Sequence, residues 1–177
     1  MLTADLRTSM LVVIDMQTRL IAAIDDAASV VANARLLVDA ARLLGAPALF
    51  TEQNPKGLGP TVTELAPDPS VVVPKMTFDS CRSPEFLLRA PADRAMVITG
   101  CEAHVCVLQT ALGLIDRGRR VFVVRDAIGS RRAESKETAI SRMARHDVEI
   151  VTAEMVVFEW LGTAEHPRFK EAAALVR

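Results

Sequence analysis

Short apolar runs rich in β-branched residues recur along the chain. Runs of this kind are typical of strands that are buried on both faces of a parallel sheet. We therefore predict six strands, at Met10–Ile14, Ala46–Phe50, Val71–Val73, Ala95–Thr99, Arg120–Val124 and Val148–Val151.

The segments between most of these runs have the periodicity of helices. In residues 30–44 apolar side chains return every three or four positions, and Gly45 follows as a helix-ending residue. The same pattern predicts helices over Val105–Arg117, Ala133–Arg145 and Ala153–Leu161. Because strands and helices alternate, we expect an α/β protein, a three-layer α/β/α sandwich with a six-stranded, mostly parallel, Rossmann-like sheet.

The length of 177 residues fits one domain over residues 1–177, and a hydrophobic content of 50% is enough for a continuous core. One long irregular stretch, Glu52–Ser70, contains several proline and glycine residues. Loops of this length in a compact domain are usually functional or mobile. We expect this stretch to cover or border a site.

The charges are balanced, with 21 Lys and Arg against 22 Asp and Glu. This balance gives no reason to expect nucleic acid or an anionic membrane as partner, and it favours a small-molecule substrate. The longest apolar run, near Met155–Phe158, is far too short to cross a bilayer. Three cysteines leave at least one thiol unpaired in a monomer, and no signal-peptide pattern precedes the first apolar run. We therefore expect a cytoplasmic protein.

Polar residues follow three of the predicted strands, and ligands of parallel sheets bind at the carboxyl ends of strands. Asp15 follows the first strand, Lys75 follows the third, and Cys106 lies shortly after the fourth. Each has an ordinary alternative: Asp15 could cap a helix, Lys75 could be solvated, and Cys106 could be a packed small hydrophobe. These alternatives would have to hold for a carboxylate, an ammonium and a thiol at the same sheet edge. A catalytic site is the more plausible explanation.

Cys106 is predicted to lie in the first turn of a helix. The helix dipole and the unpaired N–H groups of such a turn lower a thiol pKa and can bind an oxyanion. We therefore expect the position to favour a thiolate.

Three motifs carry a family resemblance: Val-Ile-Asp15-Met-Gln, Pro74-Lys75 followed by Phe78, and Gly100-Cys-Glu-Ala-His-Val-Cys106-Val. Together they resemble the isochorismatase-like cysteine hydrolases, over nearly the whole chain. The segment Thr51-Glu-Gln-Asn-Pro-Lys-Gly-Leu-Gly59 is similar to the branch called isochorismatase domain-containing proteins. The resemblance implies a catalytic triad of Asp15, Lys75 and Cys106.

In the roles that the resemblance implies, Cys106 attacks a carbonyl carbon and forms a thioester. Asp15 accepts the thiol proton and returns it to the leaving amine, while Lys75 holds the two charges together. The resemblance also implies a cis peptide between Cys101 and Glu102, which would aim the N–H groups of Glu102 and Cys106 at the oxyanion.

Departures from related enzymes narrow the expected reaction. Nicotinamidases of this superfamily carry a metal-binding Asp-x-His after the second strand, where this chain has Thr51-Glu52-Gln53-Asn54. We therefore expect no metal and no cofactor, and we disfavour nicotinamidase. True isochorismatases lack the nucleophilic cysteine, so Cys106 also disfavours vinyl ether cleavage. An amide, imide or ureido bond is the expected target.

Several further residues are candidates for the walls of a substrate pocket, although packing in the core or between helices explains each equally well: Gln17, Phe78, His104 and Trp160. His104 is two residues from Cys106, and residues two apart on a helix point away from each other, so a Cys-His dyad is disfavoured. Asp126 resembles the aspartate of an Asp-Ala turn that stabilises loop geometry near the site of the family.

Two alternative functions remain open on the sequence. The chain could be a binding or scaffold protein that keeps the triad with little turnover. It could also be a thiol redox protein that uses Cys101 and Cys106.

Apolar residues in the last two helical segments, Val156–Trp160 and Phe169, together with the oligomeric habit of the family, predict a homo-oligomer.

Overall fold

The computed structural model describes residues 2–176 and contains one sheet of six strands in the order β3-β2-β1-β4-β5-β6. Every strand pair in this sheet is parallel. The strands are β1 (Ser9–Ile14), β2 (Ala48–Gln53), β3 (Val72–Lys75), β4 (Ala95–Cys101), β5 (Val121–Gly129) and β6 (Glu149–Val151). The predicted α/β class and parallel sheet are confirmed.

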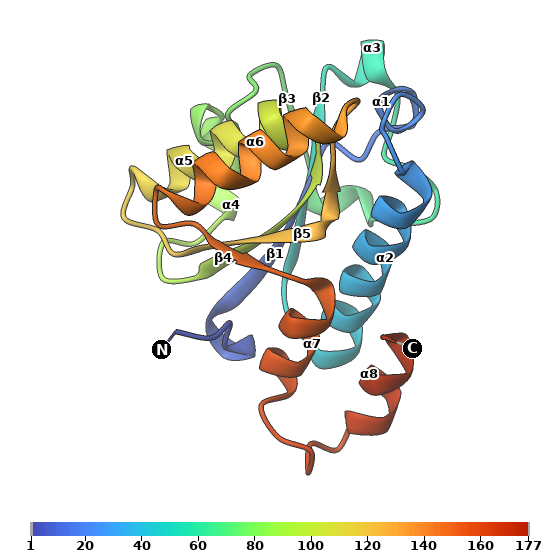
Figure 1. Cartoon of the computed structure of the whole chain (residues 1–177), viewed down its shortest axis with the longest axis vertical. Helices are drawn as coiled ribbons and strands as arrows, with labels where there is room; N and C mark the ends of the chain where they lie inside the picture. The colour runs from blue at the N-terminus through green and yellow to red at the C-terminus, as the bar shows by residue number, and fades with distance from the viewer. Residues whose placement is uncertain (1, 177) are drawn as a thin grey trace.

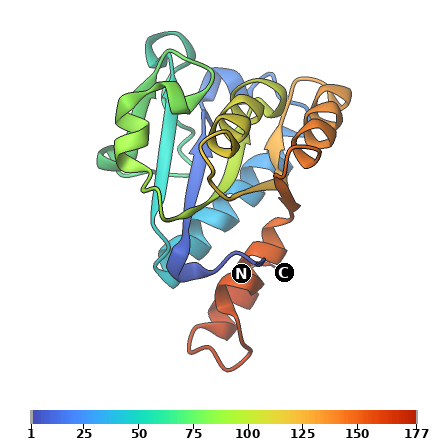
Figure 2. The same ribbon diagram turned by 90° about the vertical axis from the view of Figure 1, so that its left-hand side faces the viewer.

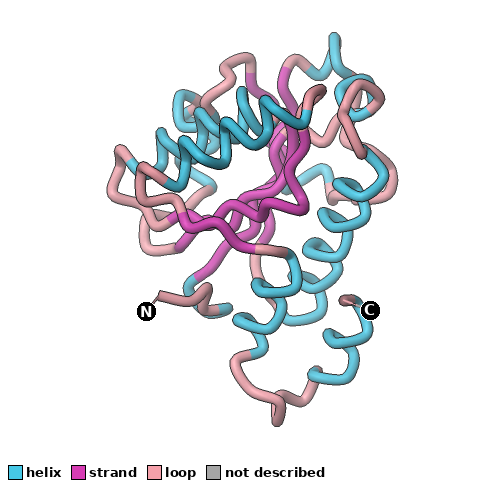
Figure 3. Tube along the Cα trace, in the orientation of Figure 1, coloured by secondary structure: helices cyan, strands magenta, loops and turns pink. Residues whose placement is uncertain are grey.

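Helices cover both faces of the sheet (Figures 1 and 3). They are α1 (Thr18–Ile21), α2 (Ala27–Leu44), α3 (Pro55–Leu58), α4 (Pro84–Arg89), α5 (Leu108–Ile115), α6 (Ala133–Ala144), α7 (Ala153–Leu161) and α8 (Phe169–Leu175). Short 3-10 turns lie at η1 (Leu6–Thr8), η2 (Pro69–Val71) and η3 (Ser80–Arg82), and a π-helical turn, η4, spans Ala103–Val107.

Two separate apolar clusters pack on the two faces of the sheet. One joins the sheet to α2, α7 and α8, and the other joins it to α4, α5 and α6. Figure 2, turned by 90°, shows the helices on either side of the sheet. Strands β1 and β4 are buried along almost their whole length because both faces are covered.

The sheet reverses its strand order between β1 and β4, the point at which ligands bind in open parallel sheets. Gly100 permits a close approach of these two strands at their carboxyl ends. Its φ is +128°, and an added Cβ would lie 2.0 Å from the carbonyl oxygen of Ile14. A side chain at this position would therefore push apart the strand ends that precede Asp15 and Cys106.

Strand β5 is longer than predicted. Its pairing with β4 shifts register between Ile98 and Gly100, so that β5 contains more residues than β4 over this stretch. The predicted Asp-Ala turn at Asp126 therefore lies inside the strand. The carboxylate of Asp126 accepts a hydrogen bond from the N–H of Ala153, so it anchors the start of α7 rather than a loop at the site.

Candidate active site

Asp15 follows β1 and lies with its carboxylate in the protein interior. Its φ is +50°, in the left-handed region that non-glycine residues rarely adopt. The residue is fully buried, and the helix that follows has Gln17, not Asp15, as its N-cap. The alternative that Asp15 serves as a helix cap is therefore wrong.

Lys75 ends β3 and reaches Asp15 through the interior. Its Nζ lies 2.6 Å from Asp15 Oδ2, and the side-chain exposures are 1% for Lys75 and 0% for Asp15. The same ammonium donates to the carbonyl oxygen of Thr77 at 3.1 Å. Lys75 is thus a buried partner of a carboxylate and not a solvated surface lysine.

Cys106 lies in the π-helical turn η4 instead of the first turn of an α-helix. Its residue exposure is 3%, and its Sγ lies 3.4 Å from Oε1 of Gln53 at the end of β2. Interactions with Asp15 and Lys75 both act on the thiol. The structure therefore brings together the three residues that were predicted from three different strand ends.

The pKa of the Cys106 thiol is raised well above its ordinary value. Burial is the largest cause, followed by the negative charge of Asp15, whereas the charge of Lys75 acts in the opposite direction. A hydrogen bond with Asp15 raises the pKa further, and one from the backbone N–H of Glu102 lowers it. The expectation of a resting thiolate is wrong, because burial and Asp15 outweigh the favourable backbone groups. The thiol is protonated at neutral pH, so it needs a base.

The peptide bond between Cys101 and Glu102 is cis. Glu102 is buried, and its Oε2 accepts from Nε of Arg131 at 3.0 Å, which ties this segment to the residues after β5. Next to it, Nδ1 of His104 lies 2.9 Å from Oγ of Ser130. His104 therefore contacts the chain beyond β5.

Two residues in the second half of β2 belong to the site although the sequence did not single them out. Thr51 donates its hydroxyl to Asp15 Oδ1 at 2.7 Å, and Gln53 contacts the thiol. Both follow the second predicted strand, in a segment whose family resemblance implied no role for either side chain. Their alternation along β2, with Glu52 between them, is the signal that places them on one face.

Gln17 is fully buried and holds Gln53 in place. Its Nε2 donates to the carbonyl oxygens of Gln53 and Gly59, and its Oε1 accepts from the N–H of Gln53. This glutamine thus clamps the end of β2 through the backbone and is not itself a wall of an open pocket.

The stretch after β2 is ordered by similar polar contacts. Glu52 Oε1 accepts from both the N–H and the hydroxyl of Thr61, and Arg19 donates to the carbonyl oxygen of Gly57. The short helix α3 lies within this stretch. The segment therefore borders the site as an anchored loop.

The remaining predicted pocket residues are more dispersed. Phe78 is 48% exposed and lies after Lys75. Trp160 is buried in the cluster of α2, α7 and α8, whereas Cys106 belongs to the cluster on the opposite face. Trp160 does not line the site, because it lies on the apolar face of α7, which packs into the core.

Cys101 and Cys106 also belong to opposite clusters. Cys101 packs against Met16, with 3.7 Å between Sγ and Sδ, on the face of α2 and α7. Cys106 faces Gln53 on the other side. All three cysteines are free thiols. A disulfide needs adjacent Cβ atoms, so this arrangement disfavours the redox alternative.

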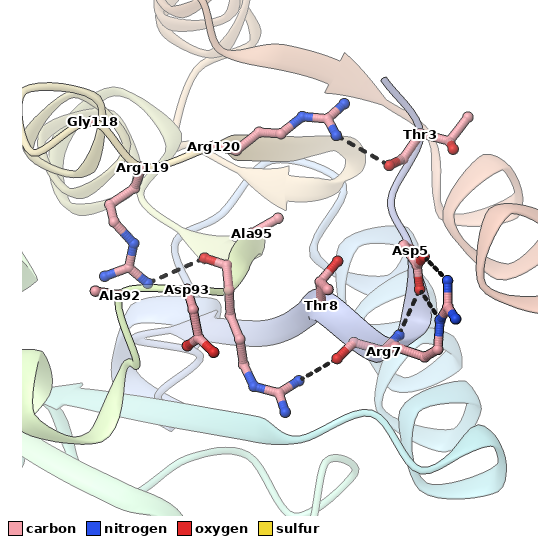
Figure 4. Close-up of a pocket in the computed structure, with 11 residues that line it drawn as sticks. Thr3, Asp5, Arg7, Thr8, Ala92, Asp93, Ala95, Gly118, Arg119 and Arg120 are labelled. Atoms are coloured by element: carbon pink, nitrogen blue, oxygen red, sulfur yellow. Dashed lines mark hydrogen bonds and ion pairs between the residues drawn. The ribbon is translucent and has the colours of Figure 1, made fainter. Parts of the chain in front are cut away.

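A pocket rich in arginine lies at the opposite end of the sheet. It is lined by Arg7, Arg94, Arg119 and Arg120 near the amino ends of β1, β4 and β5 (Figure 4). Arg94 and Arg119 donate to backbone carbonyl oxygens there. This pocket shares no residue with the candidate active site.

Over residues 2–176, no group of three or more His, Cys, Asp or Glu side chains is arranged to hold a metal ion. In the same range, no helix is long and apolar enough to span a membrane.

Comparisons with known proteins agree with the fold. The isochorismatase domain model matches residues 9–155. Isochorismatase domain-containing protein 2 from Xenopus laevis is 39% identical over 173 residues, which cover 96% of this chain and 84% of that protein.

Solved structures are similar over almost the whole chain. A structure described as MAR1 ribonuclease from Caenorhabditis elegans is 35% identical, has a TM-score of 0.91, and is matched over 98% of this chain and 92% of its own. The YcaC protein from Escherichia coli, described as an octameric hydrolase of unknown specificity, is 23% identical with a TM-score of 0.89, over 99% of this chain and 89% of its own. The second similarity concerns the fold alone.

Proposed function

The chain belongs to the isochorismatase family of hydrolases, and from this premise we propose that it is a cysteine hydrolase of small carbonyl compounds. Its substrates are amides, imides or ureides, cleaved at a C–N bond through a thioester on Cys106. The observation that supports the proposal is the meeting of Asp15, Lys75 and Cys106 at one buried point between β1, β3 and β4.

The first chemical step is a proton transfer from Cys106 to Asp15 as the sulfur attacks the carbonyl carbon. A raised thiol pKa makes this base necessary, because few thiolates exist at neutral pH before substrate binds. Lys75 keeps its positive charge beside the site and stabilises the negative charge that moves from carboxylate to sulfur.

The second part of the reaction releases the amine and then the acid. The N–H of Glu102, which points to the sulfur, and the N–H of Cys106 bind the oxyanion of the tetrahedral intermediate. Asp15 returns its proton to the leaving nitrogen as the C–N bond breaks. Water then attacks the thioester and gives one proton to Asp15. As the C–S bond breaks, Asp15 passes this proton to the sulfur, so the acid is released and both the thiol and the carboxylate are restored. The cycle uses no metal or cofactor.

Variants of Cys106 test this function. The purified protein is incubated with a panel of small amides, imides and ureides, and amine release and the intact mass are followed. We expect turnover and a transient acyl adduct on Cys106, both lost in Cys106→Ala and Cys106→Ser. Cys81→Ala is the matched control, because Cys81 is a buried free thiol that lies near the carbonyl oxygen of Thr110 and is influenced by Asp79 and not by Asp15.

The same experiment separates the enzyme from a scaffold protein. A scaffold binds members of the panel without amine release and without an adduct. Full turnover by Cys106→Ala on a substrate that the wild type cleaves would contradict the assignment of the nucleophile.

RNA is the substrate implied by the name of the Caenorhabditis elegans protein. For this chain, a net charge of -1 and a thiol that is 3% exposed favour a small molecule. We expect no cleavage of a labelled RNA under conditions in which an amide is hydrolysed.

A homo-oligomer in the cytoplasm is the proposed working form. Met155 and Phe158 of α7 are 45% and 40% exposed, which leaves apolar area for a second copy. Light scattering coupled to size-exclusion chromatography measures the mass; a protein that stays monomeric at micromolar concentration contradicts this part of the proposal.

A further inference from the structure

The carboxylate of Asp15 has a second buried partner besides Lys75. Thr51, in the middle of β2 and 1% exposed, donates its hydroxyl to Asp15 Oδ1 at 2.7 Å, while Lys75 binds Oδ2. The carbonyl oxygen of Thr51 also accepts from the N–H of Asp15 at 3.1 Å. The two residues are therefore tied through both the side chain and the main chain.

We propose that Thr51 is a positioning residue for Asp15. Thr51 holds the carboxyl group of Asp15 in place while Asp15 accepts a proton and later returns it. The proposal rests on the proposed function, because it assigns Thr51 to the base of that reaction. It adds a hydroxyl that neither the triad nor the sequence motifs assign.

Both partners of Asp15 donate a hydrogen bond to its carboxylate, Thr51 to Oδ1 and Lys75 to Oδ2. Each carboxylate oxygen has a second lone pair that can accept a proton. When a proton moves from the sulfur of Cys106 to Asp15, the S–H bond breaks, an O–H bond forms and the electron pair stays on sulfur.

The proton from Cys106 goes to a lone pair of Asp15 that these two donors leave open. It therefore stays on the side of the sulfur and the substrate, from which it can pass to the leaving nitrogen. Thr51 and Lys75 meanwhile keep their contacts with the carboxyl group, so its side chain keeps the same rotamer when it returns the proton.

The left-handed backbone of Asp15 makes such a hold necessary. With a φ of +50°, the residue has a conformation that is costly outside glycine and persists only where its surroundings fix it. The register pairs Ile14 with Thr51, so β2 presents the hydroxyl directly beside the point at which the chain leaves β1.

Substitutions that change one property at a time test the role. Thr51→Val keeps the shape and the strand preference but removes the hydroxyl, whereas Thr51→Ser keeps the hydroxyl. Thr51→Ala removes the hydroxyl without adding volume. Thr99→Val is the matched control, because Thr99 is a fully buried threonine of β4 whose hydroxyl donates to the carbonyl oxygen of Ala127.

The readout is the pH profile of the rate at which acrylamide, an electrophilic probe, labels Cys106, with adducts counted by intact mass. The hydroxyl of Thr51 donates to the base, so its loss should move the acid limb of this rate profile to higher pH. We expect a move of about one pH unit in Thr51→Val and Thr51→Ala. The limb should stay at the wild-type position in Thr51→Ser and Thr99→Val.

If Thr51→Val does not fold, the pair Thr51→Ala and Thr51→Ser gives the same comparison.

An unchanged acid limb of the acrylamide rate profile in both Thr51→Val and Thr51→Ala, or an equal move in Thr51→Ser, would overturn the proposal. Asp15→Asn distinguishes this failure from that of the proposed function. If Asp15→Asn leaves the acrylamide rate and its pH dependence unchanged, Asp15 is not the base. If Asp15→Asn alters them and the hydroxyl-free Thr51 variants do not, only the role of Thr51 fails.

Discussion

The ammonium of Lys75 lies 2.6 Å from the carboxylate of Asp15, and solvent reaches neither side chain. Two charges in this position are stable only as a pair with further hydrogen bonds, because each alone would carry a large desolvation cost. The additional bonds come from Thr51 and from the carbonyl oxygen of Thr77. A charged pair of this kind keeps a base ionised inside an apolar core, as the proposed reaction requires.

Removal of one member of the pair should destabilise the fold strongly. We expect Lys75→Met to lower the free energy of unfolding by about 3–5 kcal/mol, because it leaves a buried carboxylate unpaired. Urea unfolding at pH 7 measures the effect. Lys56→Met is the control, since Lys56 is exposed in α3 and its replacement should cost less than about 0.5 kcal/mol.

The double variant Asp15→Asn/Lys75→Met gives the sharper comparison. It removes both charges together, so it should recover much of the stability that Lys75→Met loses. Purely additive losses would show that the two side chains do not depend on each other.

The thiol of Cys106 should titrate above its ordinary range, and Asp15 should be part of the reason. The chain contains no tyrosine, so thiolate absorbance near 240 nm can be followed without tyrosinate. The difference between wild type and Cys106→Ser isolates the thiol. We expect Asp15→Asn to lower its pKa, because the negative charge and the hydrogen bond of Asp15 both raise it. A higher or unchanged pKa would contradict this electrostatic account.

Alkaline pH should destabilise the protein through its other buried thiols. Burial is the main cause that raises the pKa of Cys81 and of Cys101 to about 12. Above about pH 8.5 the unfolded chain loses these protons while the folded protein keeps them, so the stabilisation present at lower pH is lost as pH rises towards 12.

The slope of this loss is measurable. Each thiol contributes up to about 1.4 kcal/mol per pH unit within that window. Urea unfolding of wild type and Cys101→Ala at several values between pH 8 and 11 should show a shallower slope in the variant. Equal slopes would mean that Cys101 titrates alike in the folded and unfolded chains.

The sequence predicted the layers of the fold because apolar runs of strands report burial directly. It also predicted that Asp15, Lys75 and Cys106 share one sheet edge, since the direction of parallel strands determines which ends meet. The sequence did not predict on which face of the sheet a side chain lies. For this reason it could not show that Trp160 lies on the face opposite Cys106, or that Cys101 and Cys106 lie on opposite faces.

The state of the thiol could not be predicted for a similar reason. The sequence shows that backbone N–H groups are near Cys106, but burial and the distance to Asp15 are tertiary properties, and they prevail. Thr51 and Gln53 were not predicted, because their alternation places them on one face of β2 but does not show that this face meets Asp15 and Cys106 until the neighbouring strand is known.

The clamp made by Gln17 connects the stability of the loop after β2 to the reactivity of the thiol. Gln17→Leu keeps a similar volume but removes the bonds to Gln53 and Gly59. At about 1 kcal/mol for each hydrogen bond, we expect a loss of about 2–4 kcal/mol in the free energy of unfolding. Hydrogen exchange should accelerate mainly in residues 53–62, because these lose their attachment to the β1 end. As Gln53 contacts Cys106, acrylamide labelling of the thiol should change as well.

Gln109→Leu alters an exposed glutamine of α5 and should leave all three measurements near wild type. If Gln17→Leu speeds exchange evenly over the whole chain, the glutamine contributes to global stability alone and does not hold the site.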